Sequence, residues 1–454
     1  MNNDNKLGEM PVGKLLWSLA LPAIAAQVIN ALYNIVDRMY IGRIPEGGSL
    51  ALAALGVSFP IIMIISAFSA LVGMGGAPRA AIRMGEKRMD EAEKILSNAF
   101  VCLCIISAVL MIFFFFTKEK LLLMFGATEN TLPYANQYFS IYLIGTFFVQ
   151  VSIGLNQFIS AQGFAKTSMM TVLIGAICNI ILDPIFIFVF NMGVSGAALA
   201  TIISQFISAF WVLRFLFGKK TALRIRRKYF RLERRVILPV LALGLSPFIM
   251  QSTESLVQLT LNSGMKTYGG ANADLYVGTL SIIMSTMQFF TLPMMGLAQG
   301  AQPIISYNYG SKNMERVKKA FKLLIISSIA FSAVMWTAAM VIPQVFVRIF
   351  SADPELLRLG VPGMRIFMAG MLLMGAQFAC QNTLIALGQA KTSMFLALLR
   401  KVILLIPLAL ILPKFLGVTG ILIAEPIADM LAIVTTCIVF YFTTRKLFQH
   451  IESA

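Results

Sequence analysis

The sequence holds little of what enzymes and metalloproteins use for chemistry. Its 454 residues include a single histidine, His450, and five cysteines. Each cysteine lies inside an apolar run, without the spacing of a zinc site or of a disulfide framework. No nucleophile–base pair appears either. We therefore expect no enzyme, no catalytic residue, no cofactor, and no metal site apart from Na⁺ at Asp183, which is discussed below.

Charge is also scarce. Asp, Glu, Lys and Arg make up 13% of the chain, whereas soluble domains carry roughly a quarter. The net charge of +17 could suggest a nucleic-acid partner. The Lys and Arg residues, however, are confined to short segments between apolar runs, which is typical of a protein that crosses a membrane many times. We expect a multi-pass membrane protein that has contacts with lipids and no nucleic-acid partner.

Apolar runs of about 20 or more residues are long enough to span a bilayer as helices. In lipid a chain must satisfy its own backbone hydrogen bonds, so the runs predict helices, and they lack the short alternating pattern of barrel strands. They lie near residues 14–40, 51–76, 92–116, 133–158, 168–190, 194–217, 236–262, 276–302, 317–342, 360–385, 393–412 and 417–443. The fold class expected is an all-α polytopic membrane protein with twelve transmembrane helices.

The two halves of the sequence repeat each other. A shift of 225 residues aligns Pro22 with Pro247, Gly75 with Gly300 and Gly85 with Gly310. Six spans return the chain to its starting side, so the copies are predicted to be parallel lobes related by an axis along the membrane normal. We expect an N-terminal lobe (1–217), a basic linker (218–235) and a C-terminal lobe (236–454).

The basic residues predict the orientation, because cytoplasmic loops are enriched in Lys and Arg. One side holds the linker together with Lys6, Lys14, Arg79, Arg83, Lys87, Arg88, Lys94, Lys166, Lys312, Arg316, Lys318, Lys319, Lys391, Arg445 and Lys446. The opposite side holds fewer. We expect a protein of the plasma membrane, which is the inner membrane where a cell has two, with both termini cytoplasmic. The linker has two open interpretations: it lies on the anionic inner leaflet, or it is a solvated connector.

Acids in the middle of apolar spans are costly and tend to face cavities or partners. Asp183 follows Asn179 by one helical turn on the same face. Pro184 lacks an N–H, so the carbonyl of Ile180 loses its helical partner. An acid, an amide oxygen and a free carbonyl suit a proton or a hard cation such as Na⁺. The alternative is a neutral acid that only fixes two helices together.

Polar stripes also mark the first and seventh spans. Gln27, Asn30, Asn34 and Asp37 recur at intervals of three and four, as expected of a helix face that lines a wet cavity or bonds to another helix. The corresponding face of the seventh span carries Gln251, Glu254, Gln258 and Asn262. We predict that these two stripes and the acids Glu425 and Asp429 line a substrate cavity. Arg400 and Lys401 could pair with those acids, either as a structural salt bridge or as part of a transport pathway.

These residues resemble the multidrug and toxic compound extrusion (MATE) transporters, of the DinF-type branch. The resemblance covers nearly the whole chain. It rests on the repeat of six plus six spans, on the strings LYNIVDRMYIG (32–42) and NIILDPIFIF (179–188), and on the paired loops 76–92 and 301–317.

The resemblance implies a secondary antiporter that alternates access between two lobes. It would export cationic, amphipathic drugs or toxic organic compounds in exchange for H⁺ or Na⁺. Carried over by matching position, the ion-coupling residues would be Asp37, Asn156, Asn179, Asp183 and Thr201. We expect a monomer whose partners are small organic cations and membrane lipids.

Two other functions compete with this one. A flippase of a lipid-linked or amphipathic precursor, in the same superfamily, usually lines its cavity with several basic residues, whereas the intramembrane charges here are mainly acidic. A major-facilitator-type porter also has twelve spans, but its usual loop signature is missing from 76–87.

Overall fold

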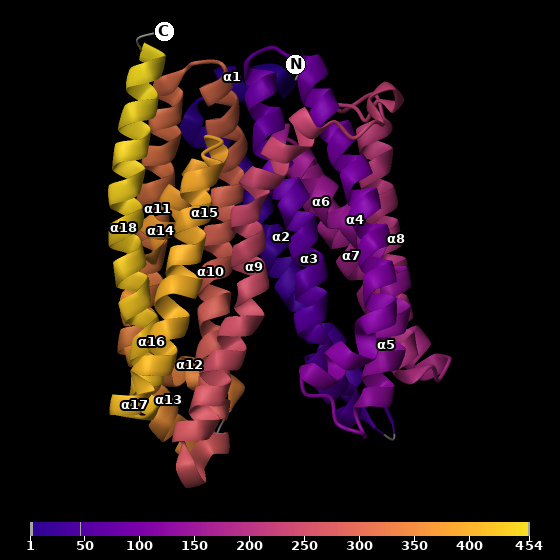
Figure 1. The fold of residues 1–454 in the computed structure, drawn as a ribbon, viewed down its shortest axis with the longest axis vertical. Coiled ribbons are helices and arrows are strands. Elements are labelled where there is room, and N and C mark those ends of the chain that lie inside the picture. Colours follow the sequence, from indigo (N-terminus) through magenta and orange to yellow (C-terminus); the bar gives the residue numbers. More distant parts are fainter. Residues whose placement is uncertain (1–2, 46, 352, 453–454) are drawn as a thin grey trace.

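The computed structural model describes residues 3–45, 47–351 and 353–452, and within these ranges the chain is helical with no strand (Figure 1). Eleven helices in the described ranges are long and apolar enough to cross a membrane. The bent pair α5 (Leu132–Ile144) and α6 (Thr146–Ala161), with an angle of 59° between them, supplies the twelfth span. The prediction of an all-α polytopic fold is confirmed.

The helices form two bundles, which we call the N-lobe and the C-lobe (Figure 1). The N-lobe consists of α1 (Asn3–Glu9), α2 (Val12–Gly42), α3 (Gly48–Gly85), α4 (Met89–Met124), α5, α6, α7 (Ala165–Pro184), the π-helical turn η1 (Ile185–Val189) and α8 (Gly193–Phe217). The C-lobe consists of α9 (Arg234–Tyr268), η3 (Gly270–Asn272), α10 (Ala273–Gly310), α11 (Met314–Val341), α12 (Pro343–Phe350), α13 (Pro354–Phe367), η4 (Ala369–Leu373), α14 (Met374–Ala386), α15 (Ala390–Leu398), the π-helical η5 (Leu399–Leu405), α16 (Ile406–Ile411), α17 (Pro413–Leu416) and α18 (Val418–Glu452).

Glycines bring the two lobes into backbone contact. A Cβ atom added to Gly85 of α3 would lie 2.0 Å from the carbonyl oxygen of Tyr307, and one added to Gly310 of α10 would lie 2.0 Å from that of Ile82. These four positions are related by the same shift of 225 residues that aligns the two halves of the sequence. The contact is therefore reciprocal, as a twofold axis between the lobes requires. The predicted pseudo-twofold repeat is confirmed.

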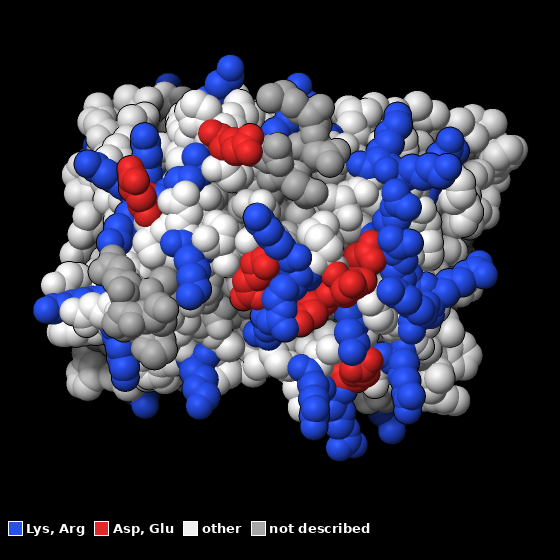
Figure 2. Space-filling view, turned by 90° about the horizontal axis from the view of Figure 1, so that it is seen from above, with Lys and Arg blue, Asp and Glu red and all other residues white. Residues whose placement is uncertain are grey.

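Both termini lie at one end of the molecule, which we call the terminal end (Figure 1). Here α1 docks onto α10, where the amide of Asn308 donates to the carbonyl of Leu7 at 3.0 Å. Lys and Arg side chains are spread over this end, with fewer acids among them (Figure 2). The two lobes contact each other toward this end, and their helices diverge toward the other end (Figure 1).

The linker is docked on the N-lobe through η2 (Arg227–Tyr229) and the residues around it. The side chains of Leu223 and Ile225 are buried, and Glu93 on α4 accepts a hydrogen bond from Nε of Arg226 at 2.9 Å. Gln162, after α6, accepts from the backbone of Leu223 at 2.8 Å. The carboxylate of Glu93 raises the pKa of Arg226. Leu223 and Ile225 are therefore folded onto the N-lobe, whereas Arg226, Arg227 and Lys228 are exposed, and contact of the linker with lipid or with solvent stays a prediction.

Candidate functional site

Two carboxyl groups meet inside the N-lobe. Asp183, at the end of α7, is fully buried, and Asp37, on α2, is 7% exposed. The two side chains lie beside each other, within reach of a hydrogen bond that can form only if one of them holds a proton. The π-helical turn η1 begins just after Asp183, where Pro184 interrupts the helical hydrogen bonds. A local break in α7 thus places the acid next to α2.

Two polar side chains surround Asp183. The amide nitrogen of Asn179 donates to Oδ1 of Asp183 at 3.3 Å and contacts Oγ1 of Thr201 at 3.4 Å. The Thr201 hydroxyl in turn donates to the carbonyl of Ala197 at 3.0 Å. Helices α2, α7 and α8 therefore each contribute one or more oxygen-bearing side chains to the same place.

Several buried oxygens of this group have no hydrogen-bond donor among the described residues. They are Oδ1 of Asp37, Oδ2 of Asp183 and Oδ1 of Asn179. A buried acceptor without a partner costs about 1–3 kcal/mol, and more when it is charged. A proton shared by the acids, or a hard cation that takes oxygen ligands, would remove this cost. The chemistry of the cluster therefore fits either H⁺ or Na⁺.

Asn156, the remaining residue predicted for ion coupling, bonds elsewhere. Its amide nitrogen donates to the carbonyl of Ser168 at 3.2 Å, at the opposite end of α7 from Asp183. Its Oδ1 atom is also buried without a donor among the described residues. The structure thus brings together four of the five predicted coupling residues and leaves Asn156 outside their hydrogen bonds.

Three tyrosines beside the acids were not predicted. Tyr33 on α2 and the buried Tyr138 on α5 interact electrostatically with the acids, Tyr138 lies close to Thr201, and the buried Tyr142 on α5 lies beside these two tyrosines. The rings of Tyr138 and Tyr142 are stacked, with centroids 6.3 Å apart. In the sequence these tyrosines look like ordinary aromatic packing. Two of them at a spacing of four, in the same span as Asn156, are the signal that could have revealed them.

The predicted polar stripe of the first span divides into separate roles. Asp37 joins the acid group, while Gln27 reaches across to the C-lobe, where its amide donates to Gln299 at 3.1 Å. The amide of Asn34 donates to the carbonyl of Asn30 on its own helix at 2.7 Å, and Asn30 is exposed. Gln27 thus bonds to another helix, while the prediction that the stripe lines a wet cavity stays a prediction.

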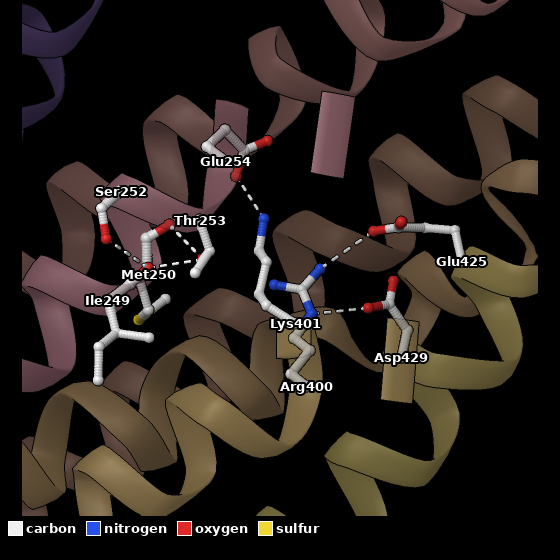
Figure 3. A network of polar contacts seen from close by, with 9 residues as sticks. All are labelled: Ile249, Met250, Ser252, Thr253, Glu254, Arg400, Lys401, Glu425 and Asp429. Carbon is white, nitrogen blue, oxygen red and sulfur yellow. Dashed lines mark hydrogen bonds and ion pairs between the residues drawn. The ribbon is translucent and has the colours of Figure 1, made fainter. Parts of the chain in front are cut away.

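The C-lobe holds a second group of charges, the C-lobe charge cluster: Glu254, Arg400, Lys401, Glu425 and Asp429 (Figure 3). Nε of Arg400 lies 2.8 Å from Asp429, and its Nη2 lies 3.5 Å from Glu425. Lys401 pairs with Glu254. Arg400 therefore pairs with Glu425 and Asp429, which the sequence left open as a possibility, whereas Lys401 pairs with Glu254 instead. In the stripe beside Glu254, Gln258 is exposed, and Gln251 and Asn262 are half-buried.

Comparisons with known proteins agree with this architecture. The family model described as MatE matches residues 22–185 and 248–411, once in each lobe. The multidrug export protein MepA of Staphylococcus haemolyticus is 28% identical over 428 residues, covering 93% of each chain. MepA of Staphylococcus aureus strain NCTC 8325 is 25% identical over 437 residues, covering 96% of this chain and 95% of the relative. A solved outward-facing multidrug resistance MATE family transporter superposes with a TM-score of 0.89 at 23% identity over 98% of both chains.

Proposed function

The chain belongs to the MatE family of membrane transporters, and on this basis we propose that it is a multidrug efflux transporter that exchanges organic cations for H⁺ or Na⁺. The relatives that carry the name of multidrug export protein cover nearly its whole length. Members of this family transport small molecules and are not enzymes. The site of action is the plasma membrane, where the helices cross many times and both termini face the cytoplasm.

The observation that carries the coupling proposal is the set of unpaired buried oxygens on Asp37, Asn179 and Asp183. An ion or proton bound there cancels one of the two negative charges of the acids, and its departure restores that charge inside the N-lobe. The two occupancies differ in energy, so they favour different arrangements of the lobes. A gradient of the coupling ion can therefore drive the exit of a cationic substrate.

The arrangement of the lobes supports alternating access. Their contact lies toward the terminal end, and their helices diverge toward the other end (Figure 1). With the terminal end in the cytoplasm, the contact between the lobes lies on the cytoplasmic side. The DinF-type branch is also proposed, because its coupling residues match the N-lobe acids. We further propose a monomer surrounded by lipid.

Efflux of ethidium from proteoliposomes, with proton and sodium gradients imposed separately, tests the function. Wild type is expected to expel the dye under at least one gradient, and that gradient identifies the coupling ion. Asp183→Asn is expected to lose gradient-driven efflux. Asp274→Asn, which changes an exposed acid at the start of α10, serves as the matched control and should transport as wild type does.

Two results would contradict the proposal. Normal gradient-driven efflux by Asp183→Asn would refute the coupling site. Failure of folded wild type to move organic cations, together with movement of a lipid-linked precursor between leaflets, would favour the flippase instead.

A further inference from the structure

The C-lobe charge cluster contains more acids than bases. Arg400 and Lys401, which are consecutive on η5, face the carboxyl groups of Glu254, Glu425 and Asp429 (Figure 3). The electrostatic partners of Arg400 and Glu425 are all members of this cluster. When every member is ionised, the cluster is one positive charge short of neutrality.

Glu425 is the carboxylate of the cluster whose negative charge is least compensated. Arg400 holds Asp429 at 2.8 Å through Nε, but Glu425 only at 3.5 Å through Nη2. Glu425 is 4% exposed, so water compensates its charge poorly. The charge of Lys401 also acts on Glu425, although its ammonium pairs with Glu254. Lys401 is therefore shared electrostatically between two carboxylates.

Accessibility differs sharply within the Lys401–Glu254 pair. The side chain of Glu254 is 47% exposed, whereas that of Lys401 is 10% exposed. Glu254 is therefore the accessible member of the pair, while Lys401 stays within the protein. The flexible four-carbon stem of a lysine allows its ammonium to change partners without movement of the backbone.

We propose that Glu254 binds a monovalent organic cation and that Lys401 is an internal competitor, which moves from Glu254 to Glu425 when the cation arrives. The bound cation supplies the charge that the cluster lacks, so that three carboxylates then face three positive charges. This inference rests on the proposed function and names one binding group for its substrate.

The charge count sets the class of ligand. A monovalent cation brings the cluster to neutrality, whereas a dication exceeds it and an uncharged compound leaves it unchanged. The neighbouring Met250, one turn before Glu254 on α9, favours a ligand with apolar surface next to its charge, because a thioether adapts to irregular apolar shapes. A small inorganic cation or a proton could supply the same charge, so the test must separate these sources.

The test measures the affinity of purified, detergent-solubilised protein for ethidium by fluorescence polarisation. Tetraphenylphosphonium and the uncharged triphenylphosphine oxide serve as competing ligands. We expect Lys401→Met to bind both cations about tenfold more tightly, because the internal competitor is gone. We expect Glu254→Gln to bind them about tenfold more weakly. Binding of triphenylphosphine oxide should be unchanged in each variant.

Two further variants separate this idea from a purely structural ion pair. Lys401→Arg retains the competing charge and should stay within about threefold of wild type. Glu425→Gln removes the excess negative charge away from the ligand. It should weaken cation binding while preserving or raising the thermal stability of the protein, since the charge that is removed is poorly compensated.

The proposal is overturned if Lys401→Met binds cations no more tightly than wild type, or if it changes the binding of the uncharged ligand equally. If Lys401→Met does not fold, unchanged cation affinity in Glu425→Gln overturns it. Competition by Na⁺ or protons that is as strong as that by tetraphenylphosphonium at similar concentration would assign the charge to an inorganic ion and also refute it. If wild type shows normal ethidium efflux, any of these results refutes this inference alone. If wild type shows no efflux, the proposed function itself is refuted.

Discussion

Replacing Gly244 by alanine is expected to part the two lobes at the terminal end without unfolding either of them. Gly244 lies on α9 of the C-lobe and faces Leu71 on α3 of the N-lobe. A Cβ atom at Gly244 would lie 1.7 Å from the carbonyl oxygen of Leu71, where neither partner is a flexible side chain. The clash is therefore between two helix backbones, each fixed within its own lobe.

The size of the effect follows from this distance. Ordinary van der Waals contact begins at 3.4 Å, so the two helices must separate by about 1.7 Å, the difference between these two distances. Forcing extra atoms into packed structure costs about 1–3 kcal/mol. If the protein has a second conformation in which α3 and α9 are separated, that conformation does not carry this packing cost. The population should then shift toward it by about 5- to 150-fold.

Distances between spin labels measure this shift. Lys166 on α7 and Lys391 on α15 are exposed, repeat-related positions, one in each lobe. Labels on cysteines at both, in a background without the five native cysteines, should show a longer distance component in Gly244→Ala. Gly56→Ala is the matched control, because a Cβ at this glycine of α3 meets nothing within 4 Å.

A wild-type distance distribution in folded Gly244→Ala would refute the reasoning. It would mean that α3 and α9 accommodate the methyl group by local bending, so that the lobes do not move as rigid bodies about their contact. The same conclusion would follow if Gly56→Ala altered the distances as much as Gly244→Ala.

Two other variants test the packing. Arg400→Met should lower the free energy of unfolding by about 3–5 kcal/mol, because two buried carboxylates lose their shared guanidinium. Thermal unfolding in detergent should show this loss of stability. The addition of Asp429→Asn should restore part of it, because one of the unpaired carboxylates is then removed. A double variant no more stable than Arg400→Met would contradict this pairing. Gln162→Ala removes the acceptor of the buried amide of Leu223, at a cost of about 1–3 kcal/mol, while the hydroxyl of Thr221 keeps the carbonyl of Leu223 as an acceptor. Limited proteolysis should then cut the linker faster, and an unchanged cleavage rate would show that the linker is held by other contacts.

The architecture could be predicted from the sequence because it depends on periodic and compositional signals. Apolar runs give the spans, and the shift of 225 residues gives the twofold relation that the contacts of Gly85 and Gly310 show in space. The fourth predicted span is not a straight helix, because α5 and α6 meet at an angle at Gly145. A Cβ at Gly145 would lie 2.6 Å from Ile202, so this glycine packs closely against α8, and a single sequence does not display such a contact between distant segments.

The candidate site was predictable only where its residues are neighbours along one helix. Asn179 and Asp183 are one turn apart, and their spacing alone predicts their contact. Thr201 came from the family resemblance, and so did the coupling role of Asp37, which its spacing placed only in the polar stripe of the first span. Tyr138 and the pairing of Arg400 with Asp429 depend on how separate helices rotate against each other. For Arg400 this rotation includes the π-helical turn η5, which changes the direction of the side chains.

The linker shows the same limit. Its basic residues predicted contact with lipid or solvent, yet its alternate apolar residues Leu223 and Ile225 are buried against the N-lobe. Charge density alone could not distinguish a segment that is folded onto the protein from one that lies on lipid or in solvent. The partners that decide this, Glu93 and Gln162, lie in distant parts of the sequence.

The most direct measurement of ion occupancy at Asp183 is the release of the coupling ion when substrate binds. Purified protein in weakly buffered solution with a pH indicator reports protons, and radioactive sodium reports Na⁺. We expect wild type to release about one H⁺ or one Na⁺ for each tetraphenylphosphonium bound, by the linkage between two exclusive occupancies. Asp183→Asn should bind the cation and release neither. Substrate binding to wild type without release of either ion, or equal release by the variant, would contradict the claim that these buried acids exchange an ion as the protein works.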